Sequence, residues 1–283
     1  MSATETAPRS SSSARPAPPS AFPNGMARTA IELKTFFRDR DALIFIFFFP
    51  VLLLGIFVTA FGGGTMGDDG PTVAQYYTPA MIASGIFLSS FQTLAIAIAL
   101  ERDDGTLKRL RGTPMPPLAY FLGKIGLVVV TSVLQIAILL SISALLLDVE
   151  PPGSLGAWAT LAWIFLLGSA GGTVLGIAFS AIPRSARSAA AIVTPIVIIL
   201  QFISGVFFVF YELPSWMQQL GALFPLKWLA QGMRSVFLPE QMAALEASGS
   251  WEHGTTAIVL AIWLVLGLIA CRFLFRWTPR GSV

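Results

Sequence analysis

The chain alternates between long apolar runs and short polar breaks. Six runs of 18 or more mostly apolar residues follow the first forty positions, and each is long enough to cross a bilayer as a helix. Hydrophobic residues make up 55% of the chain and charged residues 12%, which is about half the charged share of a soluble protein. This pattern predicts an all-α integral membrane protein, with spans at approximately 42–61, 77–100, 118–147, 155–182, 188–210 and 254–271.

The first forty residues divide into two parts. Residues 1–25 are rich in Ser, Pro and Ala without apolar periodicity, which predicts a disordered tail ahead of a membrane domain at 26–283. Between positions 26 and 41, Met26, Ala30, Leu33 and Phe37 recur at helical spacing. We expect an amphipathic helix in the membrane interface; the alternative is a plain extension of the first span. Its polar faces carry Arg28, Glu32, Lys34 and Arg38.

Basic residues are distributed unevenly between the two sides that the spans define. All of the 18 Lys and Arg residues except Lys227 and Arg234 fall on the side of the two termini. Because cytoplasmic loops carry an excess of Lys and Arg, this asymmetry predicts that both termini lie in the cytoplasm. Lys124 and Arg272 stand near the cytoplasmic ends of spans, where a long side chain can extend its charge to water. On the opposite side, residues 211–253 mix prolines with Trp216, Trp228 and Trp251, which predicts short helices in the outer interface.

The centres of the predicted spans lack ionisable side chains. Proton-driven carriers keep such groups at membrane depth, so a proton-coupled mechanism has no evident residue here, although a sodium site made of carbonyls and hydroxyls stays open. Three glutamines, Gln92, Gln135 and Gln201, lie in three different spans. They are candidates either for hydrogen bonds between helices or for a substrate path. In the fourth span, Gly168, Gly172 and Gly176 predict close approach by another helix.

Residues for catalysis or for metal binding are not evident. The Gly123-Lys124 pair lacks the upstream glycine of a P-loop, and the chain has one Cys and one His. We therefore expect no catalytic, cofactor or metal site, and no ATP hydrolysis, in this chain.

A charged island, Leu100 to Pro117, separates the second and third spans. Asp103 and Asp104 come early, where a helix dipole favours anions, and Lys108, Arg109 and Arg111 come late, where it favours cations. Gly112-Thr-Pro114 then ends the helical pattern. Two uses fit a short charged helix here: a solvated connector, or a contact for a partner on the cytoplasmic side.

Two motifs resemble a known family. They are Glu101-Arg102 with Gly105-Thr106-Leu107-Lys108-Arg109-Leu110 and Thr113-Pro114, and, downstream, Leu213-Pro214, Leu220-Gly221, Phe224-Pro225-Leu226 and Arg234. With the six-span layout they resemble the ABC type-2 export permeases, and the daunorubicin-resistance branch most closely. The chain departs from that pattern at Asp103-Asp104, where relatives often carry one acidic residue.

The resemblance implies a permease subunit that exports a hydrophobic or amphipathic cargo, such as a drug-like compound or a lipid, from a bacterial plasma membrane. It implies two ABC ATPase subunits, which bind ATP and Mg²⁺, and a second permease subunit, identical or related. No nucleic-acid partner is expected. The resemblance assigns the ATPase contact to Glu101, Arg102, Asp103, Asp104, Gly105, Thr106, Leu107, Lys108, Arg109, Leu110 and Arg111. Other classes stay open: an ion-coupled secondary carrier, a polysaccharide-exporting ABC permease, and a membrane-anchored scaffold or sensor.

Overall fold

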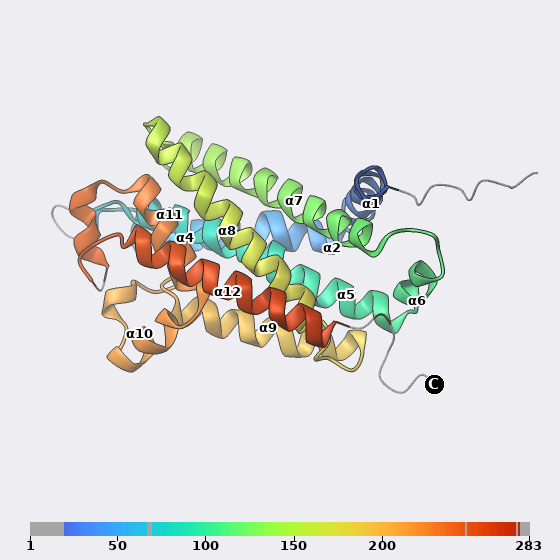
Figure 1. Cartoon of the computed structure of the whole chain (residues 1–283). Helices are drawn as coiled ribbons and strands as arrows, with labels where there is room; N and C mark the ends of the chain where they lie inside the picture. Colours follow the sequence, from blue (N-terminus) through green and yellow to red (C-terminus); the bar gives the residue numbers. More distant parts are fainter. Residues whose placement is uncertain (1–19, 67–69, 247, 276, 278–283) are drawn as a thin grey trace, which may run out of the picture.

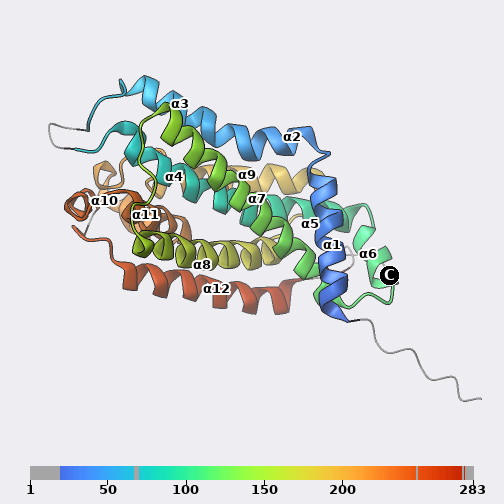
Figure 2. The same cartoon turned by 90° about the horizontal axis from the view of Figure 1, so that it is seen from above.

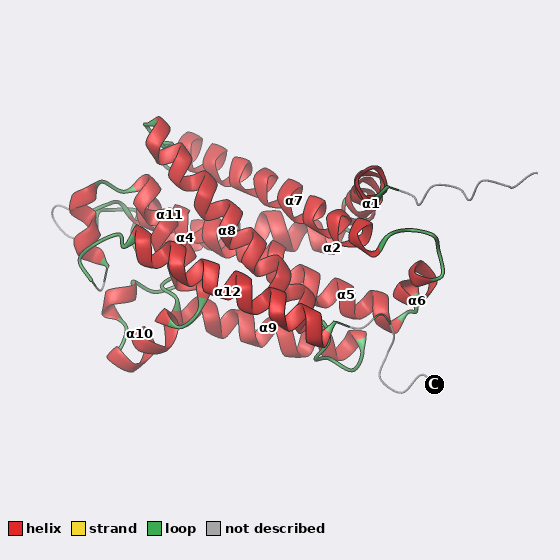
Figure 3. Cartoon of the chain, in the orientation of Figure 1, coloured by secondary structure: helices red, strands yellow, loops and turns green. Residues whose placement is uncertain are grey.

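The computed structural model describes residues 20–66, 70–246, 248–275 and 277, and this part of the chain is almost entirely helical (Figures 1 and 3). Six helical segments in it are long and apolar enough to cross a membrane, which confirms the predicted number of spans. They are Arg40–Ala60, Val73–Asp103, Pro117–Leu146, Leu155–Phe179, Ala186–Ile203 and His253–Leu274.

The first two spans each contain a π-helical turn. The first consists of α2 (Arg40–Leu43), η1 (Ile44–Phe48) and α3 (Phe49–Ala60), and the second of α4 (Val73–Phe87), η2 (Leu88–Gln92) and α5 (Thr93–Asp103). The other spans are α7 (Pro117–Leu146), α8 (Leu155–Phe179), α9 (Ala186–Ile203) and α12 (His253–Leu274). The shorter helices are α1 (Ala21–Phe36), α6 (Thr106–Arg111), η3 (Phe210–Glu212), α10 (Ser215–Ala222), α11 (Pro225–Phe237) and η4 (Glu240–Leu245).

Helix boundaries follow local capping chemistry. A capping box between Thr72 and Gln75 begins α4, and another between Ser185 and Ser188 begins α9. The prediction that the fifth span continues to residue 210 is wrong, because α9 ends at Ile203. Gly205 follows with a φ of 73°, a left-handed conformation that ends helices and that glycine adopts without strain.

The second span forms the centre of the bundle. In its most apolar stretch 83% of the residues are buried, compared with 17% for the first span and 11% for α12. Helices α3, α7, α8, α9 and α11 surround it, and Figure 1 shows α4 and α5 running through the middle of the bundle. The first span and α12 therefore expose apolar faces on the outside of the subunit, as expected of surfaces that contact lipid or another subunit.

Glycines allow α8 to lie directly against the second span, as the sequence predicted. A Cβ added at Gly172 would lie 2.0 Å from Ser90 Oγ, and one added at Gly176 would lie 2.7 Å from the carbonyl oxygen of Phe91. A Cβ added at Gly168 would lie 2.5 Å from Leu229 Cδ1 of α11. These contacts place the π-helical turn η2 in a fixed position beside α8.

Helix α1 lies across one end of the bundle (Figure 2). Residues 37–39 separate it from the first span, so the alternative of a continuous helical extension is wrong. It begins at Ala21, and the prediction of disorder is therefore wrong for residues 21–25; residues 1–19 of the predicted tail lie outside the described residues. The predicted apolar side is exposed at Met26, Ala30 and Phe37, as an interfacial helix requires.

The two ends of the bundle differ in chemistry. We call the end with α1, α6 and the α8–α9 loop the basic end, and the end with α10, α11 and η4 the Trp-rich end (Figure 1). Lys227 and Arg234 are on α11, at the Trp-rich end, as the predicted topology required.

Gly176→Ala should destabilise the subunit, because the added Cβ meets backbone atoms of η2 that cannot rotate away. We expect a loss of about 1 to 3 kcal/mol, measured as a lower thermal midpoint in lipid nanodiscs. Gly156→Ala in the same helix is the control: its nearest neighbour is Ser154 Oγ at 3.7 Å, so this change should be neutral or slightly stabilising. Equal midpoints for the two variants would contradict the close packing of α8 on η2.

Candidate functional site

The charged island forms a short helix that is anchored by its apolar side. Leu107 of α6 is fully buried in a cluster that includes Leu94, Ile98 and Tyr120. The opposite side of α6 presents exposed basic residues, which are Lys108, Arg109 and Arg111. The helix thus presents a basic surface on an apolar base.

A tight turn sets the direction of α6. Gly105 has a φ of 77°, and Asp104 Oδ1 accepts a hydrogen bond from the Thr106 backbone N–H at 2.8 Å. Arg109 donates to the carbonyl oxygen of Asp104 at 3.3 Å and to Thr106 Oγ1 at 2.9 Å. Slight burial opposes ionisation of Asp104, but the Thr106 hydrogen bonds and the Arg109 guanidinium lower the pKa of this carboxyl overall. The turn is therefore stabilised at neutral pH.

The end of α5 is tied to the α8–α9 loop. Arg102 is buried and donates from its guanidinium to the carbonyl oxygen of Ser180 at 2.5 Å and to Ser180 Oγ at 3.0 Å. Asp103 accepts a hydrogen bond from the backbone N–H of Ala186, in the first turn of α9, at 3.0 Å. The guanidinium of Arg102 thus points into the protein, away from any partner surface.

Glu101 belongs to a buried ion cluster that links three helices. We call Arg28 and Glu32 of α1, Glu101 of α5, and Tyr120 and Lys124 of α7 the Lys124 cluster. Lys124 Nζ lies 2.6 Å from Glu101 and 2.9 Å from Glu32, and Arg28 lies 2.6 Å from Glu32. Tyr120 donates to Glu101 at 2.6 Å. The two cations balance the two carboxylates, so the cluster is neutral as a whole.

The position of Lys124 corrects the sequence prediction. Its side chain is 1% exposed, so it does not extend to the interface as predicted. It stays inside because two carboxylates from neighbouring helices reach it there, and paired charges tolerate burial that a single charge does not. Interior Lys124 therefore connects α1 to the charged island.

Glycines in α7 allow α1 to pack closely against it. A Cβ at Gly123 would lie 2.4 Å from Arg28 Cγ, and one at Gly126 would lie 2.4 Å from Thr29 Oγ1. The polar residues Arg28 and Glu32 thus face the protein, whereas Lys34 and Arg38 of the same predicted set are exposed. The predicted interfacial residues therefore divide between an internal and an external role.

The three predicted path glutamines lie in separate contacts. Gln92 donates to Thr194 Oγ1 of α9 at 3.3 Å, which is the interhelical bond that the sequence allowed. Gln201 is buried in α9, and Gln135 is buried in α7 against Gly85 of α4. The structure does not bring the three side chains together into one site.

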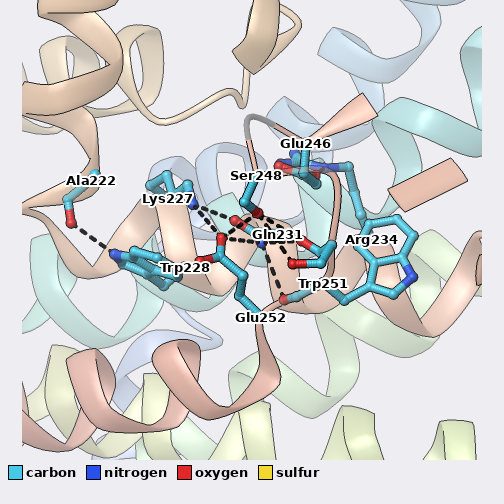
Figure 4. Close-up of polar contacts among 10 residues, drawn as sticks. Ala222, Lys227, Trp228, Gln231, Arg234, Glu246, Ser248, Trp251 and Glu252 are labelled. Atoms are coloured by element: carbon cyan, nitrogen blue, oxygen red, sulfur yellow. Dashed lines mark hydrogen bonds and ion pairs between the residues drawn. The ribbon is translucent and has the colours of Figure 1, made fainter. Parts of the chain in front are cut away.

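A second polar cluster lies at the Trp-rich end around α11 (Figure 4). Lys227 is almost fully buried; it donates to Gln231 Oε1 and lies 4.0 Å from Glu252. Its Nζ is 3.6 Å from the centroid of the Trp228 ring. Burial lowers the pKa of Lys227 to about 8, although the carboxylates of Glu246 and Glu252 oppose that shift.

Arg234 extends this cluster toward the second span. It is fully buried, donates from Nε to Glu246 at 2.5 Å and from Nη1 to the carbonyl oxygen of Gly205 at 3.1 Å, and its Cζ lies 5.2 Å from the Tyr76 ring centroid. Burial opposes its charge, but the ion pair with Glu246 outweighs burial and raises the pKa of Arg234. These contacts fix α11 to Glu246 and to the second span at the Trp-rich end.

Sequence reasoning missed the partners in both clusters. Lys124 lies within an apolar run, a signal that fits a buried partner as well as the predicted extension to the interface. The identity of the partners, Glu32 and Glu101, depends on how α1 and α5 meet α7, which no local pattern encodes. For Lys227 and Arg234 the available signal was different: they are the two basic residues on the side opposite the termini.

Comparison with protein families identifies the fold. The model of the ABC-2 type transporter family matches residues 26–238, which is most of the chain. The chain belongs to this family. A search of curated proteins found no match to this chain. The family match covers α6, the Lys124 cluster and all of α11, so the protein is a multi-pass membrane subunit of the ABC-2 transporter type.

Lys124→Met should destabilise the subunit, because it leaves Glu32 and Glu101 without their shared cation in a buried site. Removing one member of a buried ion pair costs roughly 3 to 5 kcal/mol. We expect a lower thermal midpoint in nanodiscs, and recovery when Glu101→Gln is added, because the remaining Arg28–Glu32 pair is neutral. Lys34→Met, on the exposed side of α1, is the control and should have no effect. A midpoint of Lys124→Met equal to that of the wild type would refute the role of the cluster.

Stability should rise with pH near the Lys227 cluster. The pKa of Lys227 is about 8 in the folded protein and 10.5 when unperturbed, so between these values the unfolded chain binds more protons than the folded chain. Stability therefore increases as pH rises through this window. We expect Lys227→Met to lack this increase, measured as the difference in thermal midpoint between pH 7.5 and pH 10. An identical pH dependence in wild type and variant would show that Lys227 does not titrate in this range.

Proposed function

We propose that this chain is the permease subunit of an ATP-driven exporter and that α6 docks on a separately encoded ABC ATPase. The observation that carries the proposal is the exposed basic face of α6, Lys108, Arg109 and Arg111, on a helix whose other side is anchored in the core. A solvated connector needs no such anchoring. We expect the basic face of α6 to bind an acidic cleft on the ATPase.

The surface that α6 and its flanking residues offer to a partner contains fewer residues than the motif from which the contact was predicted. Asp103, Asp104, Lys108, Arg109 and Arg111 are exposed and available to a partner. Glu101, Arg102 and Leu107 are directed inward, and they serve to fix α6 relative to the spans. The motif thus combines docking residues with anchoring residues.

The anchoring residues provide a path for force. A displacement of α6 acts on α5 directly, on α9 through Asp103, and on α7 and α1 through Glu101 and Lys124. Because the ion pairs are buried, separating these helices would expose unpaired charges to an apolar environment, which is costly. We infer that the basic end moves as a unit when the ATPases close.

The complete transporter would contain two permease subunits, identical or related, and two ATPase subunits that bind ATP and Mg²⁺. The basic end would face the cytoplasm of a bacterial cell, with both termini on that side, because Lys and Arg concentrate there. The apolar faces of the first span and α12 offer surfaces for lipid and for the second permease.

The chemistry of the spans favours an apolar or amphipathic cargo, either a drug-like compound or a lipid. In the described spans ionisable side chains are confined to the terminal turns and to Lys124, so a charged substrate finds no counter-ion at membrane depth. The same feature argues against a proton-coupled carrier.

Reversing the charge of the docking face should separate the permease from its ATPase. For the double variant Arg109→Glu and Arg111→Glu we expect roughly tenfold or weaker association and loss of ATP-dependent transport, with normal membrane insertion. The measurement is co-purification with the ATPase, followed by transport into inverted vesicles with ATP, in the presence and absence of an ionophore. Transport that needs no ATPase and collapses with the ionophore would indicate an ion-coupled carrier instead.

Two further variants separate docking from folding. Lys108→Glu with Arg111→Glu leaves the Arg109 hydrogen bonds of α6 intact and should give the same loss. Arg184→Glu with Arg187→Glu reverses charge in the α8–α9 loop and in the first turn of α9, at the same end, and should retain association. Normal association and transport in both α6 variants would refute the docking proposal.

A further inference from the structure

A row of polar contacts runs along the interface between the second span and α7. Thr78 Oγ1 lies 3.0 Å from Ser143 Oγ, and Tyr120 donates to Glu101 near the other end. Between these pairs, Gly85 of α4 meets the side chain of Gln135. The two helices are antiparallel, and these contacts keep one register through the membrane interior.

Gln135 is the unusual member of this row. It is 0% exposed, and neither its Nε2 nor its Oε1 has a hydrogen-bond partner among the described residues. A Cβ at Gly85 would lie 1.4 Å from its Nε2, so the glycine provides the space that the carboxamide occupies. Leaving a buried amide unpaired costs about 1 to 3 kcal/mol, and more in a membrane. If position 135 served packing alone, a leucine would be more favourable, because it has no polar atoms to leave unpaired.

Two hydroxyls lie one helical turn farther toward the basic end. Ser132 of α7 and Ser89 of η2 are buried, and their Oγ atoms likewise have no partner in the described part of the chain. The register of the flanking contacts places Ser89 level with Ser132. By contrast, the hydroxyl of neighbouring Thr131 bonds to carbonyl oxygens of its own helix. The unpaired groups of this interface therefore lie within about one helical turn of each other.

The second span has two local weaknesses beside this level. Pro79 lies inside α4 and removes one backbone hydrogen bond, and the π-helical turn η2 follows Gly85 by three residues. Such turns are frequent at functional sites. They allow α4 to bend away from α7 without unfolding the rest of the span.

We propose that Gln135, with the hydroxyls of Ser132 and Ser89, forms a subsite for an uncharged hydrogen-bonding group of the cargo, such as a ketone, hydroxyl or amide, when α4 and α7 separate. The carboxamide offers both a donor and an acceptor, which suits these groups. Described ionisable residues lie at other levels of the spans, so a charged group is not matched. The proposal rests on the proposed function and selects Gln135 from the three candidate path glutamines.

The test measures binding by the permease alone, in nanodiscs without the ATPase. Tritiated progesterone carries two ketones, and tritiated 5α-pregnane has the same ring skeleton without them. Loss of one hydrogen bond to the ligand weakens affinity about fivefold. We therefore expect Gln135→Leu to weaken progesterone binding by about that factor and to leave 5α-pregnane binding unchanged.

Thr131→Val is the matched control, because it removes a buried hydroxyl that is already paired within α7, and it should bind progesterone as the wild type does. The variant Arg109→Glu with Arg111→Glu should also bind normally, so failure of ATPase docking and failure of the subsite are distinguishable. No progesterone binding by the wild type, or equal effects of Gln135→Leu on both steroids, would overturn the proposal.

Discussion

A charge buried in a membrane protein requires a partner, and the structure depends on how this constraint is met at each end of the bundle. At the basic end, Lys124 is held by Glu32 of α1 and Glu101 of α5. Because a lone ammonium in that position would be very costly, the three helices have one favourable arrangement. The crosswise position of α1, the direction of α5 and the placement of α6 all follow from it. At the Trp-rich end, Arg234 and Glu246 meet the same requirement and fix α11 against the second span.

Between these two charged layers the helices are joined by close packing and single polar contacts rather than by ion pairs. Glycines bring α8 against η2, and single hydroxyl or amide contacts join the second span to α7. Both π-helical turns, η1 and η2, lie in the first two spans rather than in the four that follow. The subunit thus has ionic ends and an uncharged middle. In the proposed mechanism force would enter through the basic end, and rearrangement would take place in the middle, where fewer ion pairs must separate.

The charged island illustrates how one short motif serves two purposes. Its exposed residues offer a basic surface, and its inward-directed residues, Glu101, Arg102 and Leu107, attach that surface to the second, third and fourth spans and to α1. An external contact that was not attached in this way would move without moving the membrane helices. In the proposed coupling the two sets of residues act together, and substitutions in the segment fall into two groups with different expected consequences for folding and for coupling.

The number and approximate position of the spans, the amphipathic character of α1 and the basic face of α6 were evident from the sequence, because each depends on hydrophobicity or charge within a few helical turns. The sequence also indicated that Gly172 and Gly176 would admit a close neighbour. It did not indicate which neighbour, nor that α9 ends at Ile203, that Arg102 turns inward to Ser180, or that Lys124 is enclosed. Those features depend on residues up to about a hundred positions apart meeting in space. Only the packing of the helices decides which buried polar groups find a partner and which, like Gln135, have none among the described residues.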